Sequence, residues 1–185
     1  MATTMNTPLC GIIPPMVTPL LDDDTIDHAG LERLVEHLLA GGVHGLFNLG
    51  TTGEGPSLSH ALRCQLIETT MAQVAGRVPV LVGITDTSFV ESVELADFAA
   101  DVGSQAVVAS TPYYFATAQP ELLEYLEQLV KAVSLPLVLY NMPQLTKVSF
   151  EPDTVRQALQ WENVIGIKDS SGDMKYFNRL VEATT

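Results

Sequence analysis

Basic residues are scarce in this chain of 185 residues, which has 9 lysines and arginines against 22 aspartates and glutamates. The resulting formal charge of −13 disfavours contact with phosphate backbones and with anionic membrane surfaces. We therefore predict that neither a nucleic acid nor a membrane is a partner. The net charge does not predict which small substrates the protein binds.

Cysteine is also rare. The two cysteines, Cys10 and Cys64, lack the paired spacing of a metal site, which indicates free thiols in a reducing compartment. The histidines likewise show no ligand spacing with cysteines or carboxylates; they are His28, His37, His44 and His60. We expect them on helix surfaces or at the starts of helices and strands, and we predict no metal site.

Long apolar runs are missing, since none approaches the roughly 20 residues of a membrane span. No basic segment precedes an apolar one at Met1, so we predict no secretory signal. The hydrophobic content of 46% is that of a globular protein with one good core. We expect a soluble, cytoplasmic protein with a single domain over residues 1–185, because no linker or low-complexity stretch divides it.

Strand and helix patterns alternate along the chain. Short apolar segments predict strands at 10–18, 43–49, 78–84, 106–110, 135–140 and 164–168. Amphipathic spacing predicts helices at about 28–40, 59–75, 89–100, 120–133, 152–159 and after Asp173, with Asp27 and Ser59 as N-caps. Residues 1–9 are expected to form a loose arm, and 22–24 a solvated turn.

Alternation of this kind predicts an α/β fold with a parallel sheet and helices outside it. An open doubly wound sheet would bind ligands at one crevice, whereas a (β/α)₈ TIM barrel places functional residues at the ends of many strands. Unusual residues recur at several strand ends here, which favours the barrel. A full barrel takes about 250 residues. We therefore predict a barrel truncated after its sixth strand–helix unit, without strands seven and eight or any C-terminal helices.

The segment Gly50–Gly55, with the sequence GTTGEG, follows the second predicted strand. Its glycines let successive backbone N–H groups converge on an anion, and two hydroxyl groups add donors. It lacks the lysine of a phosphate loop, so a carboxylate fits better than a nucleotide. A plain glycine-rich turn is the alternative.

The last predicted strand stops at a lysine. Period-2 alternation puts Ile165 and Ile167 on one face, able to pack on helices, and Gly166 and Lys168 on the other. An amine that points into the fold loses hydration, which favours its neutral, nucleophilic form. A strand-end lysine that reaches to solvent is the alternative.

Two tyrosine-containing segments, TPYY (111–114) and YNMP (140–143), also end predicted strands. Tyr140 shares its parity with Val138, so we expect both side chains on the barrel side while Leu137 and Leu139 point outward. Near a lysine and a threonine, a phenol can pass protons through hydroxyl groups. A core tyrosine with a satisfied hydroxyl is the alternative.

Together with GIKDSSGD (166–173), these motifs make the chain similar to the dihydrodipicolinate synthase / N-acetylneuraminate lyase family. Members of that family are pyruvate-dependent class I aldolases on a (β/α)₈ barrel. The resemblance runs through essentially the whole chain, and the ordered set of motifs is more specific than any one of them.

The resemblance implies a lyase in which Lys168 forms a Schiff base with the keto group of pyruvate or another 2-keto acid. It further implies that Tyr140 is the general acid/base and that Thr51 relays protons. The Thr51–Thr52 region would hold the substrate carboxylate, and Tyr114 would reach into a neighbouring subunit. A homodimer or homotetramer is expected of the full-length barrel, and no cofactor.

Two residues depart from the synthase pattern. Leu145 stands where the synthases usually carry an arginine for the carboxylate of the semialdehyde, and Lys147 stands where glycine is common. The segment 46–59 is closer to 2-keto-3-deoxy sugar-acid aldolases. We therefore expect a 2-keto-3-deoxy sugar-acid substrate. The alternatives are 4-hydroxy-tetrahydrodipicolinate synthase or N-acetylneuraminate lyase activity, a phosphate- or cofactor-binding barrel, and a truncated remnant without catalysis.

Overall fold

A computed structural model describes residues 9–184. Its main sheet has five parallel strands in the order β3-β4-β5-β6-β7, so each strand pairs with the next one along the chain. The strands are β3 (Leu46–Asn48), β4 (Val80–Gly83), β5 (Ala106–Ser110), β6 (Leu137–Asn141) and β7 (Val164–Asp169). Sequential parallel pairing is the arrangement that the strand–helix alternation predicts.

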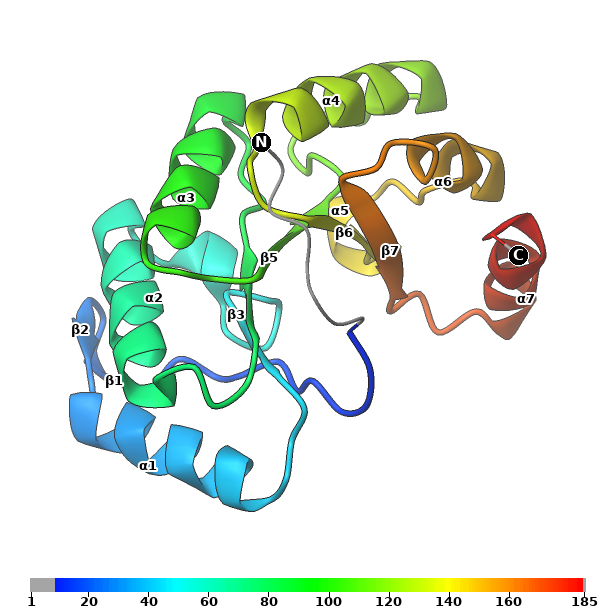
Figure 1. Cartoon of the computed structure of the whole chain (residues 1–185). Helices are drawn as coiled ribbons and strands as arrows, with labels where there is room; N and C mark the ends of the chain where they lie inside the picture. Colours follow the sequence, from blue (N-terminus) through cyan, green and yellow to red (C-terminus); the bar gives the residue numbers. More distant parts are fainter. Residues whose placement is uncertain (1–8, 185) are drawn as a thin grey trace.

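Helices connect the strands and lie around the outside of the sheet, as Figure 1 shows. The long helices are α1 (His28–Ala40), α2 (His60–Val74), α3 (Phe89–Asp101), α4 (Gln119–Ala132) and α7 (Met174–Thr184). Shorter ones are η1 (Gly55–Ser57), α5 (Pro143–Thr146) and α6 (Pro152–Ala158), and α7 packs against α6. None of the helices in residues 9–184 has the length and apolar character to cross a membrane.

Side-chain caps begin α1, α2 and α3, among other helices. Asp27 accepts a hydrogen bond from the Gly30 amide at 2.8 Å, and Ser59 accepts one from the Leu62 amide at 3.3 Å. Both predicted N-caps are thereby confirmed. Ser88 caps α3 in the same way, because its hydroxyl accepts from the Glu91 amide at 3.4 Å.

The core has two parts that follow the alternation of the strands. The larger cluster lies between sheet and helices and includes Leu137 and Leu139 of β6. The smaller one, on the inner face, contains Tyr140 among its buried residues, with Val138 packed against it. The predicted inward direction of Tyr140 and Val138 is therefore confirmed.

The first predicted strand, 10–18, is not part of the main sheet. It runs beside β3 and exchanges hydrogen bonds with Phe47, but it forms only an isolated bridge, Pro15 to Phe47. Pro14 and Pro15 lack the N–H groups that a continuous ladder needs. Of the loose arm expected at 1–9, all but residue 9 lies outside the described residues.

Two small strands that the pattern did not predict follow this segment. β1 (Leu20–Asp22) and β2 (Thr25–Ile26) form an antiparallel hairpin. The turn predicted at 22–24 is confirmed for residues 23 and 24, which connect the two strands, while Asp22 ends β1. The sequence did not predict these strands because each is too short to show alternation, and the three aspartates between their apolar residues indicate a turn.

Candidate active site

The carboxyl ends of β5, β6 and β7 bring three polar side chains into line. Ser110 lies opposite Tyr140, and Tyr140 lies opposite Lys168, in the parallel register of the sheet. The ends of parallel strands are where α/β barrels place functional side chains. The register therefore sets Lys168 and Tyr140 side by side.

Tyr140 is buried, with its ring edge-to-face against Phe47 at a centroid distance of 6.4 Å. Its hydroxyl oxygen lies 3.2 Å from Oγ1 of Thr51. Burial alone would raise the pKa of this phenol. Hydrogen bonds with Thr51, Ser170 and Lys168, together with the charge of the ammonium group, outweigh burial and lower the pKa below its ordinary value. Such a phenol gives up its proton more readily, as an acid/base group requires.

Lys168 lies against Tyr140. Its Nζ atom is 3.8 Å from the centroid of the Tyr140 ring and donates a hydrogen bond of 2.6 Å to Oγ of Ser170. A cation over an aromatic face is attracted by the ring's quadrupole. The neighbouring Asp169 accepts a hydrogen bond from the Asn141 side chain at 2.8 Å, which ties the ends of β6 and β7 together.

The backbone turn that leads into the glycine-rich loop needs two glycines, one in the loop and one at the end of β4. Leu49 has a φ of 60°, in the left-handed region that side chains rarely adopt. A Cβ atom at Gly55 or Gly83 would collide with the Leu49 carbonyl oxygen. These two glycines therefore allow the chain to turn sharply out of β3 and to present Thr51.

Within the described residues, the amides of Thr51 and Thr52 donate no hydrogen bond, whereas those of Gly53, Glu54 and Gly55 bond inside the loop. Both threonines are exposed. Free N–H groups and hydroxyls at the edge of a cavity are suitable donors to a carboxylate.

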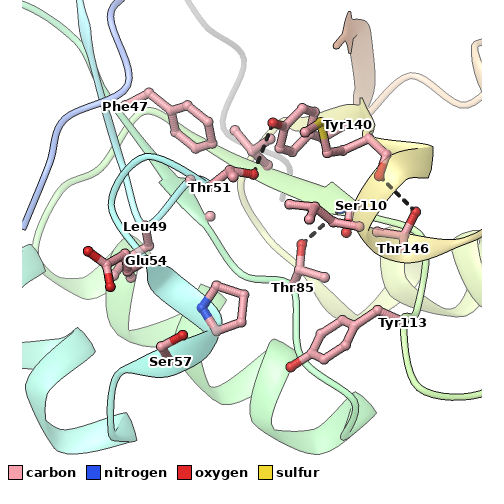
Figure 2. Close-up of a pocket in the computed structure, with 16 residues that line it drawn as sticks. Phe47, Leu49, Thr51, Glu54, Ser57, Thr85, Ser110, Tyr113, Tyr140 and Thr146 are labelled. Atoms are coloured by element: carbon pink, nitrogen blue, oxygen red, sulfur yellow. Dashed lines mark hydrogen bonds between the residues drawn. The ribbon is translucent and has the colours of Figure 1, made fainter. Parts of the chain in front are cut away.

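A cavity of about 300 Å³ opens beside Tyr140 and Thr51 (Figure 2). Hydroxyl groups and apolar side chains share its wall. The hydroxyl-bearing residues are Thr51, Ser57, Thr85, Ser110, Tyr113, Tyr140 and Thr146; the apolar ones include Phe47, Leu49, Val108, Met142 and Leu145. Glu54 is the one charged residue among the described residues that line it.

Lys168 lines a second cavity of about 300 Å³ on the inner face of the sheet, together with Ile13, Val138 and Ile167. Phe47 and Val108 belong to both cavities. Lys168, which is half-buried, thus lies on the inner face of the sheet and contacts Tyr140, which lines the first cavity. Ile165, on the other hand, is 42% exposed, although the pattern predicted that it could pack on helices.

Two of the predicted site residues stay apart from this group. Tyr114 is 81% exposed and contacts Phe115, with ring centroids 5.0 Å apart, while the preceding Tyr113 lines the cavity. Thr52 lies in the loop but not in the cavity wall. The role of Tyr114 toward a neighbouring subunit stays a prediction.

The two departures from the family pattern have visible consequences. Leu145 lines the cavity, so an apolar side chain stands where a cation was expected. Lys147 ends α5 with a φ of 65°, in the left-handed region where glycine is favoured.

Sequence reasoning missed several residues of the site. Phe47, Ser110, Tyr113 and Ser170 all contact Tyr140 or Lys168 or line the same cavity. Ser110 could have been found, because it ends a predicted strand next to the one that carries Tyr140. The loop residues Tyr113 and Ser170 have no periodic pattern that would indicate their direction.

A parallel α/β sheet with a lysine, a tyrosine and a threonine in contact at its strand ends defines the class: an α/β fold of the TIM-barrel type. The family model described as the dihydrodipicolinate synthetase family matches residues 8–185. The chain belongs to this family.

Relatives carry two different names. The chain is 39% identical over 176 residues to a 4-hydroxy-tetrahydrodipicolinate synthase of Methanopyrus kandleri, covering 94% of this chain and 59% of that one. It is 40% identical over 172 residues to a probable 2-dehydro-3-deoxy-D-pentonate aldolase of Escherichia coli, covering 92% of this chain and 57% of that one.

Solved structures have the same fold. Dihydrodipicolinate synthase from Bacteroides thetaiotaomicron superposes with a TM-score of 0.93 at 59% identity, over 97% of this chain and 60% of that one. A prophage protein of the family from E. coli, solved in complex with pyruvate, has a TM-score of 0.91 at 34% identity, over 94% and 59%. The predicted α/β barrel class is confirmed, and the chain spans about three fifths of these proteins.

Proposed function

We propose that this chain carries the chemistry of a class I aldolase, making or splitting the carbon–carbon bond between pyruvate and an aldehyde. Membership of the family supports a lyase of this kind. The observation that carries the proposal is the contact between Lys168 and Tyr140, whose hydroxyl in turn lies within reach of Thr51. The pyruvate complex of the E. coli relative supports pyruvate as the keto acid that binds here.

In the proposed reaction, the neutral amine of Lys168 adds to the keto carbon. The carbonyl oxygen takes up one proton from the amine and one from Tyr140 and leaves as water, which gives a protonated imine. The adjacent carbon then loses a proton to form an enamine, and this carbon attacks the aldehyde. In cleavage, the bond breaks and its electrons flow back into the iminium. Hydrolysis frees the amine and the product.

Three neighbouring groups serve this sequence. Tyr140 passes a proton to or from the reacting oxygen, a task that its lowered pKa favours. Thr51, at 3.2 Å from the phenol, continues the relay. The unpaired amides of Thr51 and Thr52 hold the carboxylate of the keto acid.

Reductive trapping tests the proposal. Incubation with pyruvate and borohydride should leave one covalent adduct on Lys168, located by peptide mass spectrometry. Lys168→Ala should form none, while Lys147→Ala, which removes an exposed lysine, should form as much as the unchanged chain. An adduct that persists in Lys168→Ala would refute the assignment. A folded chain without any adduct would favour the remnant without catalysis.

The cavity supports a neutral, hydroxylated aldehyde and hence a 2-keto-3-deoxy sugar acid. Its wall offers hydroxyl groups, and Leu145 cannot replace a bidentate cation for a second carboxylate. The E. coli aldolase named above supports this choice. Assayed for both reactions, the chain should release pyruvate from a 2-keto-3-deoxy sugar acid faster than it condenses pyruvate with a carboxylate-bearing aldehyde. The reverse order would favour the synthase.

We further propose a homodimer or homotetramer for the whole protein, with Tyr114 at a subunit contact, and a cytoplasmic location. The exposed pair of Tyr114 and Phe115 supports such a contact, because large apolar rings at a loop tip are suited to an interface.

A further inference from the structure

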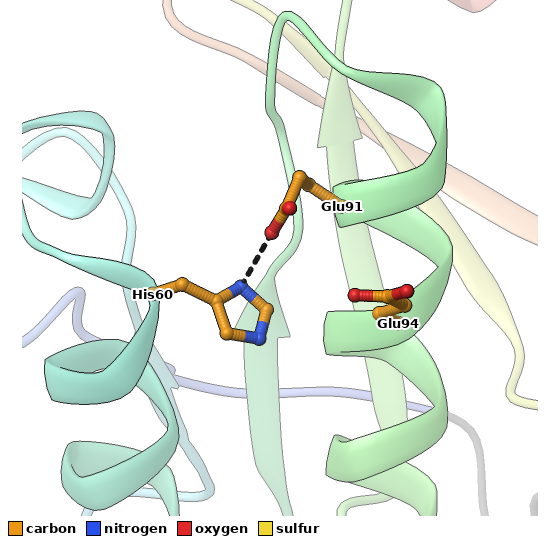
Figure 3. Close-up of side chains that lie close together, drawn as sticks. All are labelled: His60, Glu91 and Glu94. Atoms are coloured by element: carbon orange, nitrogen blue, oxygen red, sulfur yellow. Dashed lines mark ion pairs between the residues drawn. The ribbon is translucent and has the colours of Figure 1, made fainter.

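Away from the cavity, one histidine and two glutamates meet where the starts of α2 and α3 lie side by side (Figure 3). His60 is the first residue of α2, and Glu91 and Glu94 lie one turn apart on α3. Within residues 9–184 they are the one group of three histidine, cysteine, aspartate or glutamate side chains placed closely enough to share a metal ion. None of them lines either cavity described above.

The geometry of this group is close to that of a coordination sphere. One ligand atom from each side chain lies within 4.8 Å of the others, and Nδ1 of His60 is 2.9 Å from Oε2 of Glu91. This contact is an ion pair when the imidazole is protonated. Nδ1 is inaccessible to solvent and has no hydrogen-bond partner among the described residues. A shielded ring nitrogen that faces two carboxylates is placed where a metal ligand would be, although the rest of the His60 side chain is 39% exposed.

Both helix starts are fixed by their caps. Ser59, next to His60, accepts from the Leu62 amide and donates to Asp24 at 3.0 Å. Ser88 accepts from the amide of Glu91 itself. The three side chains thus project from rigid backbone, which keeps the cost of ordering them small.

We propose that His60, Glu91 and Glu94 form a binding site for a divalent transition-metal ion of the zinc and cobalt class. One imidazole nitrogen and two carboxylate oxygens are ligands that these ions accept, with water completing the shell. The ion relieves the repulsion between two carboxylates on one helix face. Arg63, the arginine nearest to His60 in the sequence, forms an ion pair of 2.7 Å with Asp86. Its charge therefore neutralises a carboxylate outside this group.

Such an ion would link α2 to α3, and these helices precede and follow β4. Metal binding at this point therefore adds to the stability of the folded chain by mass action and supplies no step of the proposed aldolase reaction. Zinc should raise the melting temperature, and the rise should depend on the three ligands.

The test uses the untagged, chelator-treated chain with Zn²⁺ in calorimetry and Co²⁺ in visible absorption. We expect one equivalent of either ion to bind. His60→Ala and Glu91→Gln should weaken affinity by about tenfold or more, and Glu94→Gln should weaken it in the same direction. Because Glu94 is exposed, its replacement leaves the fold intact, which circular dichroism verifies.

The matched control is His28→Ala, which removes an exposed histidine from the start of α1. It should leave the affinity and the zinc-dependent melting shift unchanged. The proposal is overturned if no ion binds, or if binding survives in a chain that carries His60→Ala and Glu94→Gln together. The borohydride trap at Lys168 should be unaffected by the His60 change, so failure of one proposal is distinguishable from failure of the other.

Discussion

At the scale of single residues, Tyr140 differs from Tyr113, Tyr125 and Tyr176 in the direction of its pKa shift. Burial raises the pKa of those three phenols, that of Tyr176 to about 12, whereas hydrogen bonds and the Lys168 ammonium lower the pKa of Tyr140 in spite of its burial. Tyr140 should therefore lose its proton at a lower pH than these three tyrosines.

An alkaline titration followed by tyrosinate absorbance tests this difference. The Tyr140→Phe chain should lose the earliest ionisation step, and Thr51→Val, which deletes one hydrogen bond to the phenol, should move that step to higher pH. Tyr114→Phe is the matched control and should leave the step in place. An unchanged early step in Tyr140→Phe would mean that another group is responsible.

The same shift has a consequence for stability. Because the folded chain holds Tyr140 at a lowered pKa, the unfolded chain binds more protons between that pKa and about pH 10. The contribution of this group to the free energy of unfolding is complete above about pH 10 and is lost as the pH falls through the lowered pKa.

The sequence predicted the directions of side chains correctly within β6, where residues alternate between two faces. It could not predict these directions in the loops that follow the strands. Parity along β6 placed Tyr140 inside, and register then placed it next to Lys168. In the loop after β5 no such period exists, so nothing in the sequence distinguishes the exposed Tyr114 from Tyr113 in the cavity wall. Ser170 lies beyond the end of β7, so alternation along the strand does not predict the direction of its side chain either.

At the scale of elements, α7 is attached to the body of the protein through Tyr176. The phenol donates a hydrogen bond of 2.8 Å to the carbonyl oxygen of Phe150, a fully buried residue just before α6. Leu180, one turn later on the same helix, is also buried. The remaining face of α7 is largely exposed, so Tyr176 and Leu180 are the buried residues that hold this helix against the protein.

We expect Tyr176→Phe to reduce the free energy of unfolding by about 1 kcal/mol at neutral pH, because it deletes one buried hydrogen bond. Urea unfolding followed by circular dichroism measures this. The raised pKa of Tyr176 also stabilises the folded chain below about pH 10, and this contribution is lost as the pH rises toward about 12. That alkaline loss should be smaller in Tyr176→Phe than in the unchanged chain.

Phe177→Leu is the control on the same helix, since the Phe177 side chain is 42% exposed. It should change neither the neutral value by more than a few tenths of a kcal/mol nor the alkaline behaviour. An equal loss in both variants would show that apolar contact, and not the hydrogen bond, holds α7.

Elements with long periodic patterns were predicted within a few residues, whereas β1, β2 and α5 were not predicted. The stripe of α4, with Leu122, Leu126 and Leu129 buried, is read directly from the spacing. The four-residue α5 has too few residues for any period, and a proline at its start fits a turn as well as a helix. The segment 10–18 failed because its prolines weaken the very ladder that its apolar residues predict.

At the scale of the whole molecule, the sheet ends at β7. Among the described residues, β7 pairs only with β6, and its other edge faces away from the sheet. Ile165 on this strand is 42% exposed, and Met174 at the start of α7 is 66% exposed. An open strand edge with apolar neighbours is a template for pairing with another chain.

We therefore expect the 185-residue chain to self-associate through β7 as its concentration rises, which sedimentation velocity can measure. Ile165→Lys should shift the distribution toward monomer, because a lysine on an edge strand opposes strand addition. Val90→Lys is the matched control: it places the same charge at an apolar position, 61% exposed, on the outer surface of α3. If both variants reduce association equally, the effect is one of net charge alone. If the unchanged chain is monomeric at every concentration, the edge of β7 does not mediate self-association.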